Sequence, residues 1–173
     1  MPLFGSMTHP ATNPAPGLEA LRPVVGKWHT EGQQLEGPFG PASSFVAVEI
    51  FEWLEGGHFL VHRLDGKLGQ RPAACIEIFG LNGAGELFAQ TYYNDGNTNT
   101  WRLEAEGHAL VLSGSWSKDS GPTYRLRYTA TVVDEGNTLE GKWEHSLDGE
   151  SWSTFMESRA TKAQPLPNAS VGG

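Results

Sequence analysis

The chain has 173 residues, of which 38% are hydrophobic, and it carries a formal net charge of −8. This length suits one domain with a sizeable core. The negative charge, without a basic cluster, excludes nucleic acid and anionic membranes as natural partners. No apolar run reaches the ~20 residues of a membrane helix. The single cysteine, Cys75, excludes an internal disulfide framework, and with no signal-peptide pattern it predicts a cytoplasmic protein.

Both ends of the chain mix Pro, Asn, Ala and Gly without hydrophobic periodicity. Residues 1–16 and 163–173 are therefore expected to be flexible tails on either side of one folded domain at 17–162. At the start of that domain, residues 18–21 predict one short helical turn before Pro23. Such a turn would plug or flank one end of the structure that follows.

The rest of the domain alternates short apolar segments with turn signals. Eight such signals lie between residues 55 and 150, among them Glu55-Gly56-Gly57 and Asn94-Asp95-Gly96-Asn97. These residue types supply the positive φ that hairpin turns need. Ten strands are predicted, at 26–34, 45–54, 58–64, 74–81, 86–94, 97–105, 108–115, 123–134, 137–147 and 150–161.

Sequential hairpins predict an all-β protein, a ten-stranded antiparallel up-and-down β-barrel. Closing the meander into a barrel removes the sheet edges that would otherwise be exposed. A two-sheet sandwich is the structural alternative. A closed barrel of this size keeps an interior cavity, because about eight strands already leave room for one small ligand.

Tight turns also predict which side chains share a face, since residues opposite each other point to the same side. Counting from the turns places Phe51 opposite His62, His62 opposite Glu77, and Glu77 opposite Gln90. Charged residues gather on the other face of the last five strands, so the counted face is the interior. Its predicted apolar members are Trp28, Phe51, Trp53, Phe79, Phe88, Trp101, Trp143, Trp152 and Met156. Its predicted polar members are His62, Glu77, Gln90, Tyr92, Tyr128 and His145.

The same count turns several apolar side chains outward on the second to fourth strands. They are Val46, Val48, Ile50, Phe59, Val61, Ile76 and Ile78. A solvated patch this apolar is unusual in a monomer. We expect a second subunit to cover it, giving a homodimer; the alternative is that the two faces are inverted locally.

Several short motifs occur in the order and spacing of a known family. They include Gly26-Lys27-Trp28, Glu52-Trp53-Leu54-Glu55-Gly56-Gly57, Ile76-Glu77-Ile78-Phe79-Gly80 and Gly141-Lys142-Trp143-Glu144. Together they resemble the bacterial lipocalin-like family called domain of unknown function 1579, over most of the folded unit. The resemblance implies a calycin-type barrel and no assigned activity.

The Gly26-x-Trp28 and terminal-strand pattern is also similar to the nitrobindins, ten-stranded barrels that bind haem through a histidine on a late strand. Here the last predicted strand has no histidine. Only His145, on the strand before it, is a late candidate; Met156 on the last strand can also ligate iron, although a methionine in a barrel more often serves packing. No cofactor and no metal site are therefore expected, with haem kept as an alternative.

Three interpretations of the polar row remain open. His62 and Glu77 form a ligand anchor, a general base with its orienting carboxylate, or a buried ion pair with no ligand. The leading prediction is a barrel that binds a small, largely apolar molecule with one polar head group; an enzyme acting on that molecule and an interaction domain with a filled core are the alternatives. Gln90, Tyr92 and Tyr128 are expected to bind a carbonyl or carboxylate of the guest. The predicted ligand-binding residues are Trp28, Phe51, His62, Glu77, Gln90, Tyr92, Trp101, Tyr128, Trp143, His145 and Met156.

Overall fold

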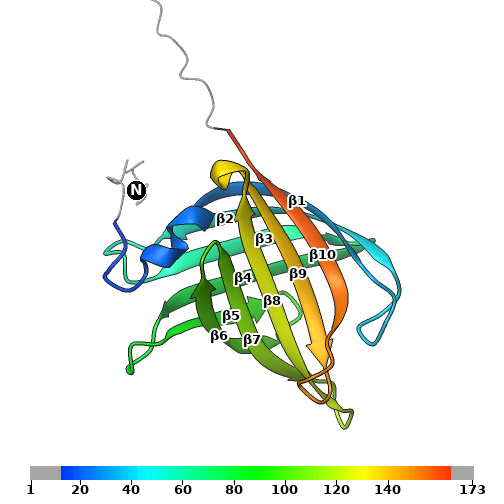
Figure 1. The fold of residues 1–173 in the computed structure, drawn as a ribbon. Helices are drawn as coiled ribbons and strands as arrows, with labels where there is room; N and C mark the ends of the chain where they lie inside the picture. The colour runs from blue at the N-terminus through cyan, green and yellow to red at the C-terminus, as the bar shows by residue number, and fades with distance from the viewer. Residues whose placement is uncertain (1–12, 165–173) are drawn as a thin grey trace, which may run out of the picture.

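The structure is a computed structural model and describes residues 13–164, so most of the two predicted tails lies outside the described residues. One antiparallel sheet closes on itself into a barrel (Figure 1). Its strands are β1 Gly26–Gln34, β2 Ser43–Trp53, β3 Leu60–Leu68, β4 Arg71–Leu81, β5 Leu87–Tyr93, β6 Thr98–Glu106, β7 Ala109–Ser117, β8 Thr123–Val133, β9 Thr138–Ser146 and β10 Ser153–Lys162. Each strand pairs with its neighbours in the chain, and β1 pairs with β10. The ten-stranded up-and-down barrel is confirmed.

A short 3-10 helix, η1 (Glu19–Val24), precedes the barrel and packs against one end of it (Figure 1). Leu18 and Leu21 are fully buried there, and the Trp28 indole donates a hydrogen bond of 2.7 Å to the Val24 carbonyl. The predicted stop before Pro23 is wrong, because the fixed φ of proline also suits a 3-10 turn. The predicted plug is present, and we call this the plugged end of the barrel.

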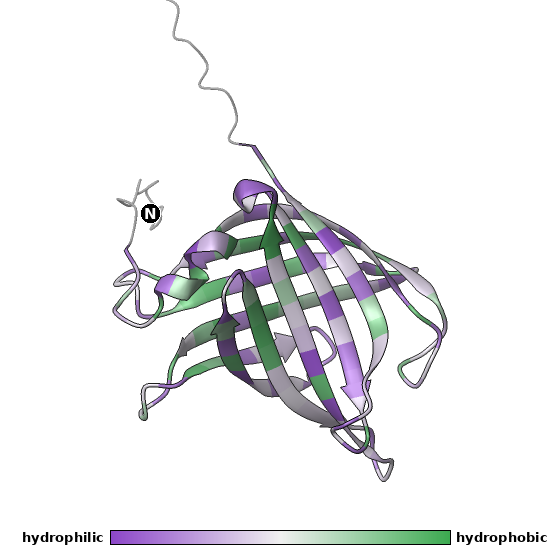
Figure 2. Ribbon diagram, in the orientation of Figure 1, coloured by the Kyte–Doolittle hydropathy of each residue, from purple (hydrophilic) through white to green (hydrophobic). Residues whose placement is uncertain are grey.

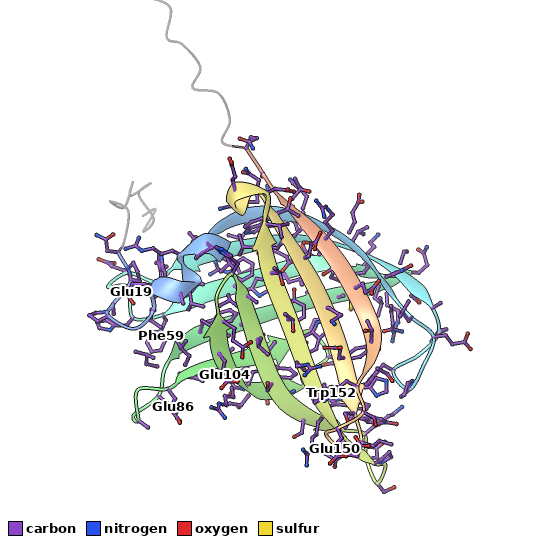
Figure 3. The ribbon with its side chains drawn as sticks, viewed as in Figure 1. Glu19, Phe59, Glu86, Glu104, Glu150 and Trp152 are labelled. Carbon is purple, nitrogen blue, oxygen red and sulfur yellow. The ribbon has the colours of Figure 1, made fainter. Side chains whose placement is uncertain are left out.

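The opposite end is partly filled by aromatic rings. Phe39, in the connection between β1 and β2, lies 4.2 Å from Phe155 and 5.3 Å from both Trp116 and His145, measured between ring centroids. Two side chains labelled in Figure 3 mark these ends: Phe59 lies near the plugged end and Trp152 near the aromatic end. The barrel interior therefore has one end closed by aliphatic side chains and the other narrowed by aromatic ones.

Hydrophilic and hydrophobic residues alternate along β8, β9 and β10 (Figure 2), as strands with one wet face require. Arg127 and Glu144 form an ion pair on the outer face, and so do Arg159 and Glu140. The predicted outward charges are therefore confirmed. None of the described helices is long and apolar enough to cross a membrane.

Two residues predicted inside are found outside. Phe88 is paired with Gly80 and Arg102 on the outer face of β5, because the β4–β5 turn has a different length from the one counted. Trp152 precedes β10 rather than belonging to it, and its ring packs under the Arg127 guanidinium, 4.2 Å from the ring centroid. Both errors come from turns whose lengths the sequence left ambiguous.

The outward apolar face of β2, β3 and β4 is present, so the faces are not inverted. Val46 is 50% exposed and Ile76 is 46% exposed, and Tyr92 on β5 extends the same surface. The homodimer expected through this face stays a prediction.

Ile76→Glu tests that homodimer, because a buried charge in the centre of an interface is costly. We expect light scattering to show half the mass of the unchanged protein. Ser115→Glu, an exposed position on β7, is the matched control. An equal mass for all three proteins would contradict a dimer through this face.

Close packing inside the barrel depends on Gly114, on β7. A β-carbon there would lie 2.6 Å from the Trp101 ring. Gly114→Ala should lower the free energy of unfolding by about 1–3 kcal/mol in a denaturant titration, as overpacking does. Gly83→Ala is the control, because no atom lies within 4 Å of a β-carbon at that position; equal stability of the two variants would refute this packing constraint.

Candidate functional site

A cavity of about 540 Å³ lies inside the barrel. It begins at the plugged end, where Val24, Leu110 and Leu139 are among its walls, and it reaches exposed rim residues at the other end, Arg71 and Asp95. Its volume lies within the range of sites for small molecules, roughly 300–1,000 Å³. The interior is therefore hollow, in contrast to the filled core of the third sequence-based alternative.

Three ionisable side chains from neighbouring strands meet on the cavity wall. His62 of β3 stands between Glu49 of β2 and Glu77 of β4. Its Nε2 lies 2.7 Å from Glu49 Oε2, and its Nδ1 lies 3.4 Å from Glu77 Oε1. All three belong to inward rows, and His62 and Glu77 face each other as Cα partners. We call Glu49, His62 and Glu77 the charged triad.

Two threonines complete the hydrogen bonds of the triad. The Thr30 hydroxyl donates to Glu49, and the Thr91 hydroxyl donates to Glu77. The Trp101 indole in turn donates to Thr91 over 2.9 Å. Each carboxylate is thus bound by a hydroxyl on one oxygen and by the imidazole on the other.

This environment changes the ionisation of the triad. Burial by itself would lower the pKa of His62, but the hydrogen bonds and charges of Glu49 and Glu77 outweigh it and raise that pKa from 6.5 to about 9. Burial would raise the pKa of Glu49, yet His62 and Thr30 bring it below its ordinary value. At neutral pH the imidazole is therefore a cation with both ring nitrogens donating.

The rings around the triad hold it in place. Phe51 stacks on the His62 imidazole with ring centroids 3.9 Å apart and planes 4° from parallel.

On another part of the wall, the rings of Tyr128 and Trp143 lie 4.8 Å apart, measured between their centroids. Gly141 leaves room for Tyr128, because a β-carbon there would lie 2.5 Å from its hydroxyl oxygen. Burial raises the pKa of Tyr128, so this hydroxyl stays neutral.

The structure brings together six of the predicted ligand-binding residues on the cavity wall. They are Phe51, His62, Glu77, Tyr128, Trp143 and Met156. Trp28 is buried at the plugged end, and Trp101 is buried inside the barrel; neither lines the cavity.

Gln90 and Tyr92 were predicted on the inner face and lie on the outer one. The predicted register of β4 with β5 is wrong by one residue, because the turn spans Asn82 to Glu86 and pairs Glu77 with Thr91 instead of Gln90. Gln90 accepts a hydrogen bond from Thr100 on the outside, and Tyr92 is 49% exposed. A compensating shift between β5 and β6 keeps Trp101 inside, opposite Ala89.

His145 lies in the aromatic end rather than on the cavity wall. Its ring is 5.3 Å from Phe39 and 5.4 Å from Tyr124, and its buried Nδ1 has no hydrogen-bond partner among the described residues. Among residues 13–164, no group of three His, Cys, Asp or Glu side chains is placed to hold a metal ion. The haem alternative through His145 or Met156 stays untested.

Sequence reasoning missed Thr30, Glu49 and Thr91. Glu49 carries a signal that identifies it, because it lies two residues before the inward-facing Phe51 and strand alternation places both on one face. Thr91 depends on the register of β5, which no local pattern indicates. Cys75 is another inward wall residue, and burial followed by the charge of Glu77 raises the pKa of its thiol to about 12.

A second hollow lies on the outer face of β6 to β9. Arg127, Lys142 and Trp152 are among its walls, and both cations pair with Glu144. Both cations are thus already paired with a carboxylate of the protein, and their side chains are partly exposed to water. The interior cavity is the stronger candidate for a ligand site.

The fold and the cavity define a calycin-like β-barrel, a class in which the barrel surrounds an internal site. A family model described as "Protein of unknown function (DUF1579)" matches residues 13–162, and the chain belongs to this family. The structure is similar to the crystal structure of Rv2717c from M. tuberculosis, with a TM-score of 0.61 and 14% identity, covering 88% of this chain and 100% of that one. This likeness supports the fold alone. No curated protein matches the chain.

The raised pKa of His62 predicts a pH-dependent stability. A histidine with a higher pKa in the folded state stabilises the protein fully below pH 6.5, its unfolded value, and loses that contribution as the pH rises through about 9. The free energy of unfolding should therefore fall by up to roughly 3 kcal/mol between these pH values. Denaturant titrations across this range measure the change.

His62→Gln is the control for the other titrating groups. We expect its stability to vary much less over the same pH range, because the imidazole that changes charge is absent. Parallel pH profiles for the two proteins would contradict the assignment to His62.

Proposed function

We propose that this protein binds a small, largely apolar molecule with one polar head group inside the barrel. The observation that carries the proposal is the combination of a 540 Å³ cavity with one polar cluster on an otherwise mostly apolar wall. Aromatic and aliphatic surfaces supply non-directional affinity, while few polar groups orient the guest. The apolar walls lie on both sides of the charged triad, toward Val24 and Leu110 in one direction and toward Phe45 and Leu68 in the other.

The geometry of His62 favours an anchor over a general base. A general base must accept a proton and needs an unprotonated nitrogen within reach of the substrate. Both nitrogens of His62 face carboxylates, and its pKa of about 9 keeps the ring protonated at neutral pH. A role in organising the two carboxylates of the ligand anchor fits this arrangement better than proton abstraction.

Uptake of the uncharged dye N-phenyl-1-naphthylamine tests the proposal. Its fluorescence rises when it leaves water for an apolar site, and we expect saturable binding with one site per chain. Leu64→Trp places a large ring in the cavity, since Leu64 is a wall residue on β3. This variant should weaken dye binding roughly tenfold or more, because the larger indole ring occupies cavity volume that the dye needs.

Thr131→Trp is the matched control, because Thr131 lies on the outer face of β8 beside Glu140. Its dye affinity should equal that of the unchanged protein. Dye binding that is absent, or that is equally strong in Leu64→Trp, would refute binding inside the barrel.

A further inference from the structure

The charged triad does not neutralise itself. Counted formally, Glu49 and Glu77 carry two negative charges and the His62 imidazolium carries one positive charge, so the triad holds one negative charge in excess. Arg71 is the other cationic residue of the cavity wall, and it is exposed at the rim. Net charge enclosed by apolar surface is unfavourable unless a counter-charge approaches it.

In every hydrogen bond of the triad, a carboxylate is the acceptor. Both N–H groups of His62 point at carboxylates, and the hydroxyls of Thr30 and Thr91 donate to the same carboxylates. The N–H of Trp101 is directed at Thr91. The donors of the cluster are therefore directed at protein atoms, whereas each carboxylate oxygen keeps a further lone pair.

A guest head group that accepts hydrogen bonds finds no free donor in the triad, and an anionic one faces two carboxylates. A head group that donates hydrogen bonds and carries a positive charge meets the remaining acceptors and cancels the excess charge. The rings of Tyr128 and Trp143, on another part of the cavity wall, also favour a cation, since aromatic faces attract positive charge.

We propose that the cavity selects an organic cation, a protonated amine attached to an apolar body, with its ammonium group bound by Glu49 and Glu77. This inference rests on the proposed binding function and names the chemical class of its ligand. The sequence predicted the opposite kind of head group, a carbonyl or carboxylate that accepts hydrogen bonds, on the basis of Gln90, Tyr92 and Tyr128. Two of those three residues lie outside the barrel. Asp95 at the rim and the net charge of −8 also favour the approach of a cation.

Three probes with the same ten-carbon chain test the head group: decylamine, decanol and decanoate. Each is titrated at pH 7 against the protein loaded with N-phenyl-1-naphthylamine, and displacement of the dye gives its affinity. We expect decylamine to bind at least tenfold more tightly than decanol, and decanoate to bind the weakest of the three. Decanol or decanoate binding as tightly as decylamine would overturn the proposal.

Two variants locate the effect on the triad. Glu77→Gln and Glu49→Gln each remove the excess charge, and each should reduce the preference for decylamine over decanol to less than half while dye affinity persists. Glu140→Gln removes the same charge from the exposed outer face, where Glu140 pairs with Arg159, and should leave the preference unchanged. An equal reduction in Glu140→Gln would assign the preference to the overall field of the protein and overturn the role of the triad.

The outcomes separate the two proposals. If the unchanged protein binds neither the dye nor any probe, the binding function itself fails. If the dye binds but the amine has no advantage, only the assignment of the head group fails. The order of affinity of the three probes for the unchanged protein tests the assignment of the head group even if a buried substitution prevents a variant from folding.

Discussion

The pairing of β1 with β10 closes the sheet, and the properties of the interior depend on that closure. In a closed barrel every strand has two neighbours, so no backbone edge remains unpaired and alternate side chains must point inward. Ten strands enclose more space than the inward side chains fill. The aliphatic plug of η1 closes one end, the aromatic group around Phe39 narrows the other, and the interior stays hollow out to the rim at Arg71 and Asp95.

The charged triad is held by three successive strands of this cylinder. Antiparallel pairing places Glu49 beside Leu64, and His62 beside both Phe51 and Glu77, so the imidazole lies within reach of carboxylates on each side. Buried carboxylates and a buried imidazole are each costly alone, and together they share protons and hydrogen bonds. The raised pKa of His62 results from this mutual support, and it favours a cationic ring over a general base, which was one of the three interpretations of the sequence.

The outer surface of the barrel is a weaker candidate for a ligand site than the interior. Ion pairs such as Arg127 with Glu144 and Arg159 with Glu140 join charges of neighbouring strands from β8 to β10. The apolar face of β2 to β4 is exposed, with Val46 and Ile76 about half accessible. The cavity, in contrast, joins enclosed volume, aromatic walls and one polar cluster.

Sequence patterns were sufficient to predict the ten strands, their order and the inward position of His62 and Glu77. These follow from alternation and from turns such as Glu55-Gly56-Gly57, which are local properties of the chain. It did not decide the register across the turn from Asn82 to Glu86, because a one-residue change in a glycine-containing turn has little local cost yet moves Gln90 outside and Thr91 inside. Nor did it reveal Glu49 as the second partner of His62, because Glu49 faces Leu64 across the β2–β3 ladder and reaches the imidazole only diagonally, through its side-chain conformation. Only the closed tertiary structure, with every strand paired on both sides, decided which carboxylates surround the imidazole and therefore which sign of charge the cavity presents.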